Sequence, residues 1–191
     1  MNFYSFLEII GTVFSLLFCY LVIKENIWCW LFGILASAIS FVLFIKATLY
    51  AEAILGLYYI GIGLYGWAVW KSNHKRVIAI SKWSLKFNSI AVAISTILSA
   101  GLGFAMATCT NATNPYTDAT ITIFSFLASY KEAQKILSGW FFWILINATS
   151  SVLYFQRSLY YYAGLAIVYT FMSIWGYYRW QKQYTQQQII S

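Results

Sequence analysis

Long apolar stretches alternate with short polar breaks along the whole chain. Seven stretches follow one another, at about residues 3–23, 26–46, 49–70, 86–108, 115–131, 136–156 and 159–180. A membrane-spanning helix needs about 20 mainly apolar residues, which is the length of these stretches. Apolar residues run continuously within each stretch and do not alternate with polar ones, which favours helices over a β-barrel. The pattern predicts an all-α integral membrane protein with seven transmembrane helices.

Composition excludes the other broad classes of protein. Of the 191 residues, 61% are hydrophobic, 21% aromatic and only 9% charged. A soluble domain carries about 25% charged residues, and a disordered chain lacks aromatic residues. We therefore expect residues 1–191 to form a single membrane domain embedded in a lipid bilayer. A secretory leader is not expected, because Glu8 lies where a basic leader segment would be.

The basic residues indicate an orientation. With the N-terminus on one side, alternate loops and the termini sort the charges into two groups. That side receives only Lys46 and Arg157. The opposite side receives Lys24, Lys71, Lys75, Arg76, Lys82, Lys86, Lys131, Lys135, Arg179 and Lys182. Because basic loops stay in the cytoplasm, the N-terminus is predicted outside and the C-terminus inside. The positive charge thus reflects topology, and no nucleic-acid partner is expected.

The chain repeats itself at an offset of 110 residues. Between residues 8–70 and 118–180, 20 of 63 positions are identical, well above chance even for so biased a composition. Matching pairs include Trp30 with Trp140, Leu49 with Leu159, Tyr59 with Tyr169, Gly66 with Gly176 and Trp70 with Trp180. The chain thus divides into repeat one at about 3–70, a connecting helix at about 86–108 and repeat two at about 113–180.

Two three-helix repeats joined by one helix point to a transporter. The first helices of the two repeats cross the membrane in the same direction, because four crossings separate them. This is a 3+1+3 arrangement of parallel repeats, like that of the SWEET transporters. Repeats of this kind place a substrate site between the two halves near the membrane midplane. We therefore expect a transporter.

The best candidate for substrate binding is the group Trp140, Trp143 and Asn147. Spacings of three and four place these side chains on one helical face. Two indoles offer a stacking platform for an aromatic ring, above all a cationic one. Asn147 offers a donor and an acceptor. The repeat pairs Trp143 with Gly33 and Asn147 with Ser37, so the first repeat offers small residues and space. The alternative is that these tryptophans only fill the helix bundle.

Acids and other reactive side chains are few. Glu8, Glu52 and Asp118 lie near the predicted outer ends of their helices, where they either attract a cation into an outer vestibule or simply stabilise a helix start. No metal-ligand cluster and no cofactor are expected. No acid, histidine or lysine is expected near the midplane, so a proton relay lacks its parts. Facilitated diffusion is therefore predicted.

The remaining tryptophans near span ends are interpreted as interfacial anchors. They are Trp28, Trp67, Trp70, Trp175 and Trp180. A membrane enzyme is disfavoured, because no nucleophile and base have suitable spacing. A retinal-type receptor is disfavoured, because the last span contains no lysine for a Schiff base. A subunit of a larger energy-coupled transporter stays open.

At this point the chain resembles the PnuC family of bacterial vitamin transporters, whose best-known branch carries nicotinamide riboside. The resemblance covers nearly the whole chain. It rests on the motifs Glu8-x-x-Gly11, Asn26-x-Trp28-x-Trp30-x-x-Gly33, Leu49-Tyr50-Ala51-Glu52, Asn114-Pro115-x-x-Asp118-Ala119 and Trp140-x-x-Trp143-x-x-x-Asn147.

The resemblance implies seven helices as 3+1+3 in the bacterial inner membrane and a homotrimer with one pathway in each protomer. It implies energy-independent uptake of nicotinamide riboside, which is then trapped in the cytoplasm by phosphorylation. It also implies that Trp140, Trp143 and Asn147 line the substrate site, with Ser37 and Gly56 from the first repeat. A pyridinium ring with a carboxamide fits the stacking and hydrogen-bonding chemistry inferred for Trp143 and Asn147.

Two departures from the family leave the substrate open. Many members that carry nicotinamide riboside have Gln where this chain has Gly56, and an acid where it has Ser138. Loss of a polar group from a site that hydrogen-bonds its substrate changes discrimination strongly. Other branches of the family are associated with thiamine, which is also a cationic aromatic, and with flavins. Thiamine is therefore the first alternative substrate and riboflavin the second.

Overall fold

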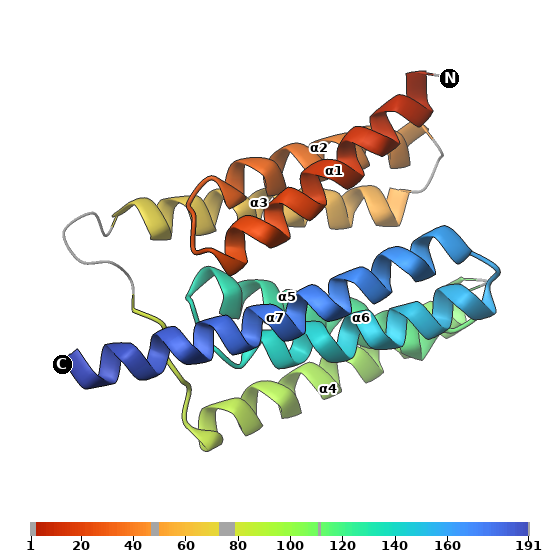
Figure 1. Ribbon diagram of the computed structural model, residues 1–191. Coiled ribbons are helices and arrows are strands. Elements are labelled where there is room, and N and C mark those ends of the chain that lie inside the picture. The colour runs from red at the N-terminus through yellow and green to blue at the C-terminus, as the bar shows by residue number, and fades with distance from the viewer. Residues whose placement is uncertain (1–2, 47–49, 73–78, 111, 191) are drawn as a thin grey trace. The chain divides into compact units, whose positions relative to one another are not determined.

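The computed structural model describes residues 3–46, 50–72, 79–110 and 112–190. These residues form seven helices (Figure 1), which are α1 (Phe3–Ile23), α2 (Cys29–Lys46), α3 (Tyr50–Ser72), α4 (Leu85–Cys109), α5 (Pro115–Ala133), α6 (Gly139–Gln156) and α7 (Tyr160–Ile190). Extended pairing in the described part is limited to an isolated bridge between Ser81 and Ile136. The all-helical prediction is confirmed.

Several helix ends differ from the sequence prediction, and three of the larger differences lie in the second unit. Helix α5 continues through Ala133, so residues 131–133 belong to a helix and not to a loop. Helix α6 begins at Gly139, because Ile136 forms the bridge with Ser81, whose backbone bonds to Lys135 and Leu137. Helix α7 extends through Ile190, ten residues past the predicted end of the apolar stretch. Its last turns are rich in glutamine, which has a good helix propensity although it is polar.

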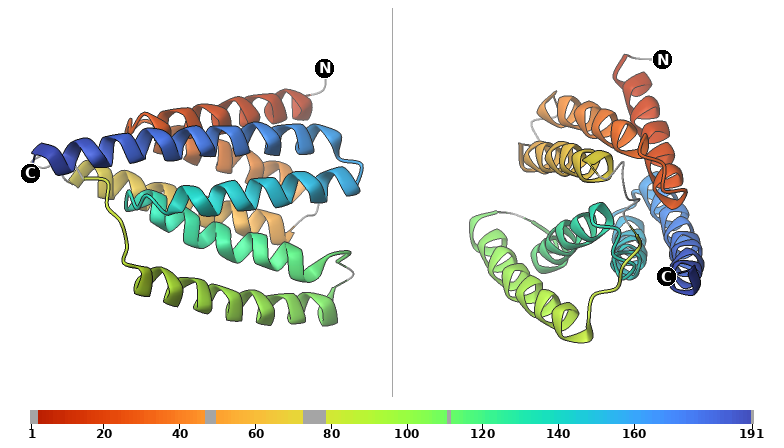
Figure 2. Two further views of the ribbon diagram at one scale, coloured as in Figure 1. Left: turned by 60° about the horizontal axis from the view of Figure 1, so that its bottom comes forward. Right: turned by 90° about the vertical axis from the view of Figure 1, so that its left-hand side faces the viewer.

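The chain divides into two compact units, residues 1–78 and 79–191, where the sequence predicted one membrane domain. In the first unit α2 packs against both α1 and α3, and in the second α4, α5, α6 and α7 pack in chain order (Figure 2). Consecutive helices joined by short turns are each other's natural neighbours. The division falls between α3 and α4, at the end of the predicted first repeat.

Among the residues that the structure describes, four helices are long and apolar enough to cross a membrane. The qualifying segments are Phe6–Ile23, Cys29–Lys46, Ala53–Lys71 and Leu85–Cys109, in α1 to α4. Over the described residues, α5, α6 and α7 are not among the helices that meet both conditions. Helix α5 carries Asp118, Lys131 and Glu132, and α6 carries Asn147. Ionisable and polar side chains are tolerated in a membrane helix where they face protein or a polar cavity.

A tryptophan pair packs each repeat at equivalent positions. The Trp30 and Trp70 rings meet edge to face, with centroids 5.5 Å apart and an interplanar angle of 89°. Trp140 and Trp180 meet at 5.3 Å, also at 89°. Trp30 and Trp140 are each only 2% exposed. The two pairs are related by the 110-residue offset, so the repeat extends from sequence to side-chain packing.

Each pair depends on a glycine in the next helix. A Cβ atom on Gly66 would lie 2.5 Å from two ring atoms of Trp30, and one on Gly176 would lie 2.6 Å from two ring atoms of Trp140. Real Cβ atoms do not approach so closely. Trp70 and Trp180 are buried in these clusters, so their interpretation as interfacial anchors is wrong. Trp28, which is 53% exposed, has the accessibility expected of an anchor.

The turns after α1 and α5 share one conformation. Glu25 and Lys135 have left-handed φ angles of 55° and 51°. The amide of Asn26 donates to the Leu21 carbonyl at 2.9 Å, and the amide of Ile136 donates to the Lys131 carbonyl at 2.8 Å. This bond pattern around a left-handed residue is the Schellman motif that ends many helices. The first two helices of each repeat are therefore joined by the same turn.

A glycine comparison tests the packing of the first repeat. Gly66→Ala is expected to lower the free energy of unfolding by about 1–3 kcal/mol, because the added methyl group overpacks the Trp30 ring. Gly61→Ala, in the same helix, is the control because nothing lies within 4 Å of its Cβ position. That variant is expected to be neutral or stabilising, since alanine favours helix. Thermal unfolding of the purified protein measures both, and equal stability of the two variants would contradict this packing.

Candidate functional site

The three candidate residues of α6 have different environments. Trp140 is enclosed by Trp180 and Gly176 and is 2% exposed, so its ring faces are used in packing. Trp143, one turn later, is only partly buried. Asn147 follows after another turn and is also partly buried. Of the two predicted stacking groups, Trp143 is therefore the one with ring surface left for a ligand.

Trp143 and Asn147 also differ in how their polar groups are used. The Trp143 indole nitrogen Nε1 is buried and makes no hydrogen bond among the described residues. Asn147 Nδ2 donates to Ser173 Oγ of α7 at 3.4 Å, and Ser173 Oγ donates to the Tyr169 carbonyl at 2.8 Å. The long bond to Ser173 fixes the orientation of the amide weakly. The amide of Asn147 therefore keeps hydrogen-bonding capacity for a ligand, whereas the indole N–H of Trp143 is buried against protein.

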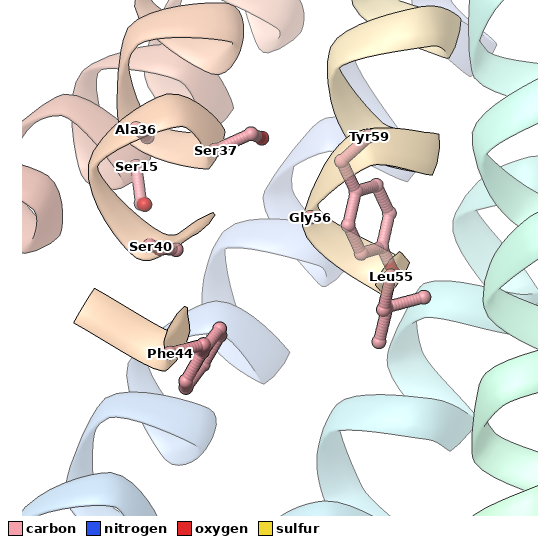
Figure 3. Close-up of a pocket in the computed structure, with 8 residues that line it drawn as sticks. All are labelled: Ser15, Ala36, Ser37, Ser40, Phe44, Leu55, Gly56 and Tyr59. Atoms are coloured by element: carbon pink, nitrogen blue, oxygen red, sulfur yellow. The ribbon is translucent and has the colours of Figure 1, made fainter. Parts of the chain in front are cut away.

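A cavity of about 220 Å³ lies within the first unit. Helices α1, α2 and α3 supply its lining (Figure 3), and Ser37 and Gly56, both predicted site residues, are part of it. The other lining residues are Ser15, Ala36, Ser40, Phe44, Leu55 and Tyr59. The sequence did not single out Ser15, Ser40 or Tyr59. The offset of 110 pairs them with Ser125, Ser150 and Tyr169, which are identical residues.

Two serines of the cavity present acceptors. Ser15 Oγ donates to the Gly11 carbonyl at 2.9 Å, and Ser37 Oγ donates to the Gly33 carbonyl at 2.8 Å. Each hydroxyl group thus donates its hydrogen bond to a carbonyl of its own helix and keeps lone pairs that can accept from another donor. The cavity suits a group that donates hydrogen bonds, such as a sugar hydroxyl or an amide NH₂.

The two glycines of α2 and α3 differ in the space around them. A Cβ on Gly33 would lie 2.8 Å from the Phe18 ring, so Gly33 permits close packing. A Cβ on Gly56 would meet Phe41 Cβ and the Ser37 carbonyl oxygen at 3.5 Å, which is ordinary contact. Gly56 thus leaves room in the cavity, whereas Gly33, the repeat partner of Trp143, does not. The space predicted at Gly33 is therefore filled by Phe18, and the cavity lies beside Gly56 instead.

The three acids predicted near the outer helix ends have different environments. Asp118, in the first turn of α5, is paired with Arg157 at the end of α6, whose Nη2 donates to the two carboxylate oxygens at 3.2 and 2.9 Å. Glu8 is exposed on α1. Glu52 lies in the first turn of α3, and its side chain lies outside the described residues. Asp118 is thus neutralised within the protein and is a weak candidate for attracting a cation.

Lys131 forms a buried polar cluster that the sequence analysis missed. Its side chain is 0% exposed. Its ammonium group donates to Asn88 Oδ1 at 2.5 Å and to Ser138 Oγ at 3.0 Å, and Ser138 Oγ donates to Asn88 Oδ1 at 3.1 Å. The rings of Trp83 and Phe142 lie 4.5 and 4.7 Å from Nζ. These contacts join the start of α4 to the α5–α6 turn.

The repeat itself contained the signal for this cluster. Lys131 and Glu132 correspond to Leu21 and Val22, which lie inside the first apolar stretch. Val22 is fully buried in the last turn of α1, and Glu132 is buried at the equivalent place in α5. Their charges suggested a loop, but the offset places both residues in a helix.

The comparisons with known proteins agree with this architecture. A family model described as the nicotinamide mononucleotide transporter matches residues 5–182. The chain belongs to this family. It is therefore a member of a family of transporters, and the class predicted from the internal repeat is confirmed.

Members of the family differ in their named substrates. The chain is 22% identical to the nicotinamide riboside transporter PnuC of Escherichia coli strain K12, over 92% of this chain and 85% of that protein. It is 24% identical to the riboflavin/roseoflavin transporter RibM of Streptomyces davaonensis, over 91% of this chain and 83% of that protein. A crystal structure of the vitamin B3 transporter PnuC aligns with a TM-score of 0.77 and 21% identity, over 95% of this chain and 83% of the other. This likeness shows a shared fold.

Proposed function

We propose that this protein carries nicotinamide riboside into the cell by facilitated diffusion. The observation that carries the proposal is the match to PnuC over 92% of the chain together with a partly accessible Trp143 one turn before Asn147. The pyridinium ring stacks on Trp143, because a cation is attracted to an indole face. Asn147 hydrogen-bonds the carboxamide, which has both a donor and an acceptor.

The cavity of the first unit is a separate candidate for substrate contacts, and it suits a hydroxyl-bearing group. Ser15 and Ser37 keep free lone pairs, which suit the donor hydroxyls of a ribose. Gly56 provides room, and Glu8 on the exposed side of α1 is the remaining described candidate for an outer acid. Trp140 supports Trp143 from within the α6–α7 packing and does not stack on the substrate itself.

The proposal includes a membrane arrangement. Seven helices span the bilayer as two parallel three-helix repeats around α4, with the N-terminus outside and the C-terminus in the cytoplasm of a bacterial inner membrane. The identical turns and tryptophan clusters of the two repeats support it. Phosphorylation of the riboside inside the cell traps it, and a homotrimer provides one pathway per protomer.

A second candidate substrate has its own support. RibM, named for riboflavin and roseoflavin, matches 91% of the chain. Glycine at position 56 leaves room in the cavity, which fits a larger ring system. Thiamine, a cationic aromatic like nicotinamide riboside, is the other alternative. Uptake of the three vitamins into liposomes that contain the purified protein, with no ion gradient imposed, ranks these candidates.

Trp143→Ala tests the stacking role. Loss of a desolvated cation–π contact costs about 2 kcal/mol, so affinity for nicotinamide riboside is expected to fall about thirtyfold. Isothermal titration calorimetry of the purified protein measures the change. Trp175→Ala is the matched control, because Trp175 is an exposed tryptophan of α7. Unchanged affinity in Trp143→Ala, or an equal loss in both variants, would refute the stacking platform.

A further inference from the structure

Glu132 is a buried acid next to the proposed stacking residue. It lies in the last turn of α5 and is only 6% exposed. The first turn of α6 touches α5 at this point, since a Cβ on Gly139 would lie 3.1 Å from Lys131 Cβ and 3.5 Å from the Glu132 amide nitrogen. Trp143 follows Gly139 by four residues and therefore lies on the same side of α6.

The Glu132 carboxyl and the Trp143 indole are direct neighbours. The carboxyl is within hydrogen-bonding reach of this indole, although Trp143 Nε1 makes no hydrogen bond of good geometry within the described part of the chain. The acid therefore lies beside the N–H edge of the ring that is proposed to stack on the substrate.

The adjacent cation, Lys131, is engaged elsewhere, and Arg157 lies at the opposite end of α6. The ammonium group of Lys131 is taken up by Asn88 and Ser138 and lies between two aromatic rings. Arg157 is paired with Asp118. Over the described residues, no lysine or arginine forms an ion pair with Glu132. Burying a carboxylate without a counter-charge costs several kcal/mol. A cation that enters beside Trp143 would relieve that cost.

We propose that the Glu132 carboxylate is the counter-charge for a positively charged aromatic ring stacked on Trp143, and that it makes the site select cationic over neutral heterocycles. The proposal rests on the proposed function and narrows it to N-alkylated pyridinium or thiazolium substrates. A neutral ring such as an isoalloxazine would exclude water from the carboxylate without supplying a counter-charge. The preference arises from the difference between the two ligand charges, since specificity is a difference of affinities.

Two ligands of almost equal shape test this selectivity. Nicotinamide riboside carries a positive ring, whereas its reduced dihydro form has the same ribose and carboxamide on an uncharged ring. Calorimetry on the wild-type protein is expected to show tighter binding of the cation. Glu132→Gln is expected to weaken binding of the cation about thirtyfold or more, as for removal of one partner of a buried charge pair. The same substitution leaves binding of the neutral form unchanged.

Two further variants separate charge from structure. Glu132→Asp keeps the charge and is expected to restore part of the preference. Glu25→Gln removes an acid in the turn after α1 and is expected to change neither affinity. An equal loss for both ligands in Glu132→Gln assigns a structural role to Glu132 and overturns the inference, as does an unchanged preference. If the wild-type protein binds neither form, the proposed function fails as well, so the two failures are distinguishable.

Discussion

Trp140→Ala is expected to lower the free energy of unfolding by about 3–5 kcal/mol and to leave the ligand affinity of the folded protein unchanged. The Trp140 ring is 2% exposed and fills the space between Trp180 and Gly176. Its removal leaves a cavity that neighbouring helices fill only in part. Thermal unfolding of the purified protein, followed by calorimetry at a temperature where the variant is folded, separates stability from binding.

Comparison with Trp143→Ala separates the structural role of Trp140 from a role in ligand binding. The two tryptophans lie three residues apart in α6, yet one is expected to govern stability and the other affinity. Trp30→Ala, the equivalent change in the first repeat, should destabilise to a similar extent, because Trp30 packs in the same way against Trp70 and Gly66. If the Trp140→Ala protein is stable but does not bind nicotinamide riboside, the result would indicate that Trp140 lines the substrate site.

Asn88→Ala is expected to destabilise the protein by about 1.5–3 kcal/mol, the net value of a hydrogen bond to a charged group. Asn88 Oδ1 accepts from both Lys131 Nζ and Ser138 Oγ. Its removal leaves a buried ammonium group with a single remaining acceptor, Ser138 Oγ. Thermal unfolding measures the loss.

A second substitution should rescue this variant. Lys131→Met replaces the cation by an apolar side chain of similar length, and such replacements are often neutral or stabilising. Ser138 and Asn88 still bond to each other in that variant. The double variant is therefore expected to be more stable than Asn88→Ala alone. Additive losses in the double variant would show that Asn88 acts independently of the lysine.

The helices were readily predicted because their signal is continuous. An apolar stretch of about 20 residues has few alternative structures in a bilayer. The ends of α5 and α6 were harder to place, because Lys131 and Glu132 are charged and charges usually mark loops. Here the cost of burying the lysine is offset by Asn88 and Ser138, which are 43 and 7 residues away in the chain. Spacing along a helix does not reveal such partners.

The candidate site was predicted in part. Spacing correctly grouped Trp143 and Asn147 on one stretch of α6. The repeat indicated a small residue at Ser37 and the family resemblance drew attention to Gly56, and both line the cavity. Spacing alone did not separate Trp140 from Trp143. What distinguishes them is Gly176 and Trp180 in the next helix. Their relation to Trp140 becomes visible once the same trio is recognised at Trp30, Gly66 and Trp70.

The packing of Trp30, Gly66 and Trp70, and of their equivalents in the second repeat, limits which substitutions the two repeats tolerate. A larger residue at Gly66 requires a smaller one at Trp30, and a smaller residue at Trp30 leaves a void beside Trp70, so one change alone is penalised. Substitutions at these three positions are therefore tolerated only in combination. Both repeats hold the same three residues at them. Gly33 and Ser37, in contrast, have become Trp143 and Asn147 in the other half. Two copies that drifted apart from one ancestral unit would retain identity where packing couples several residues and lose it where a ligand needs asymmetry.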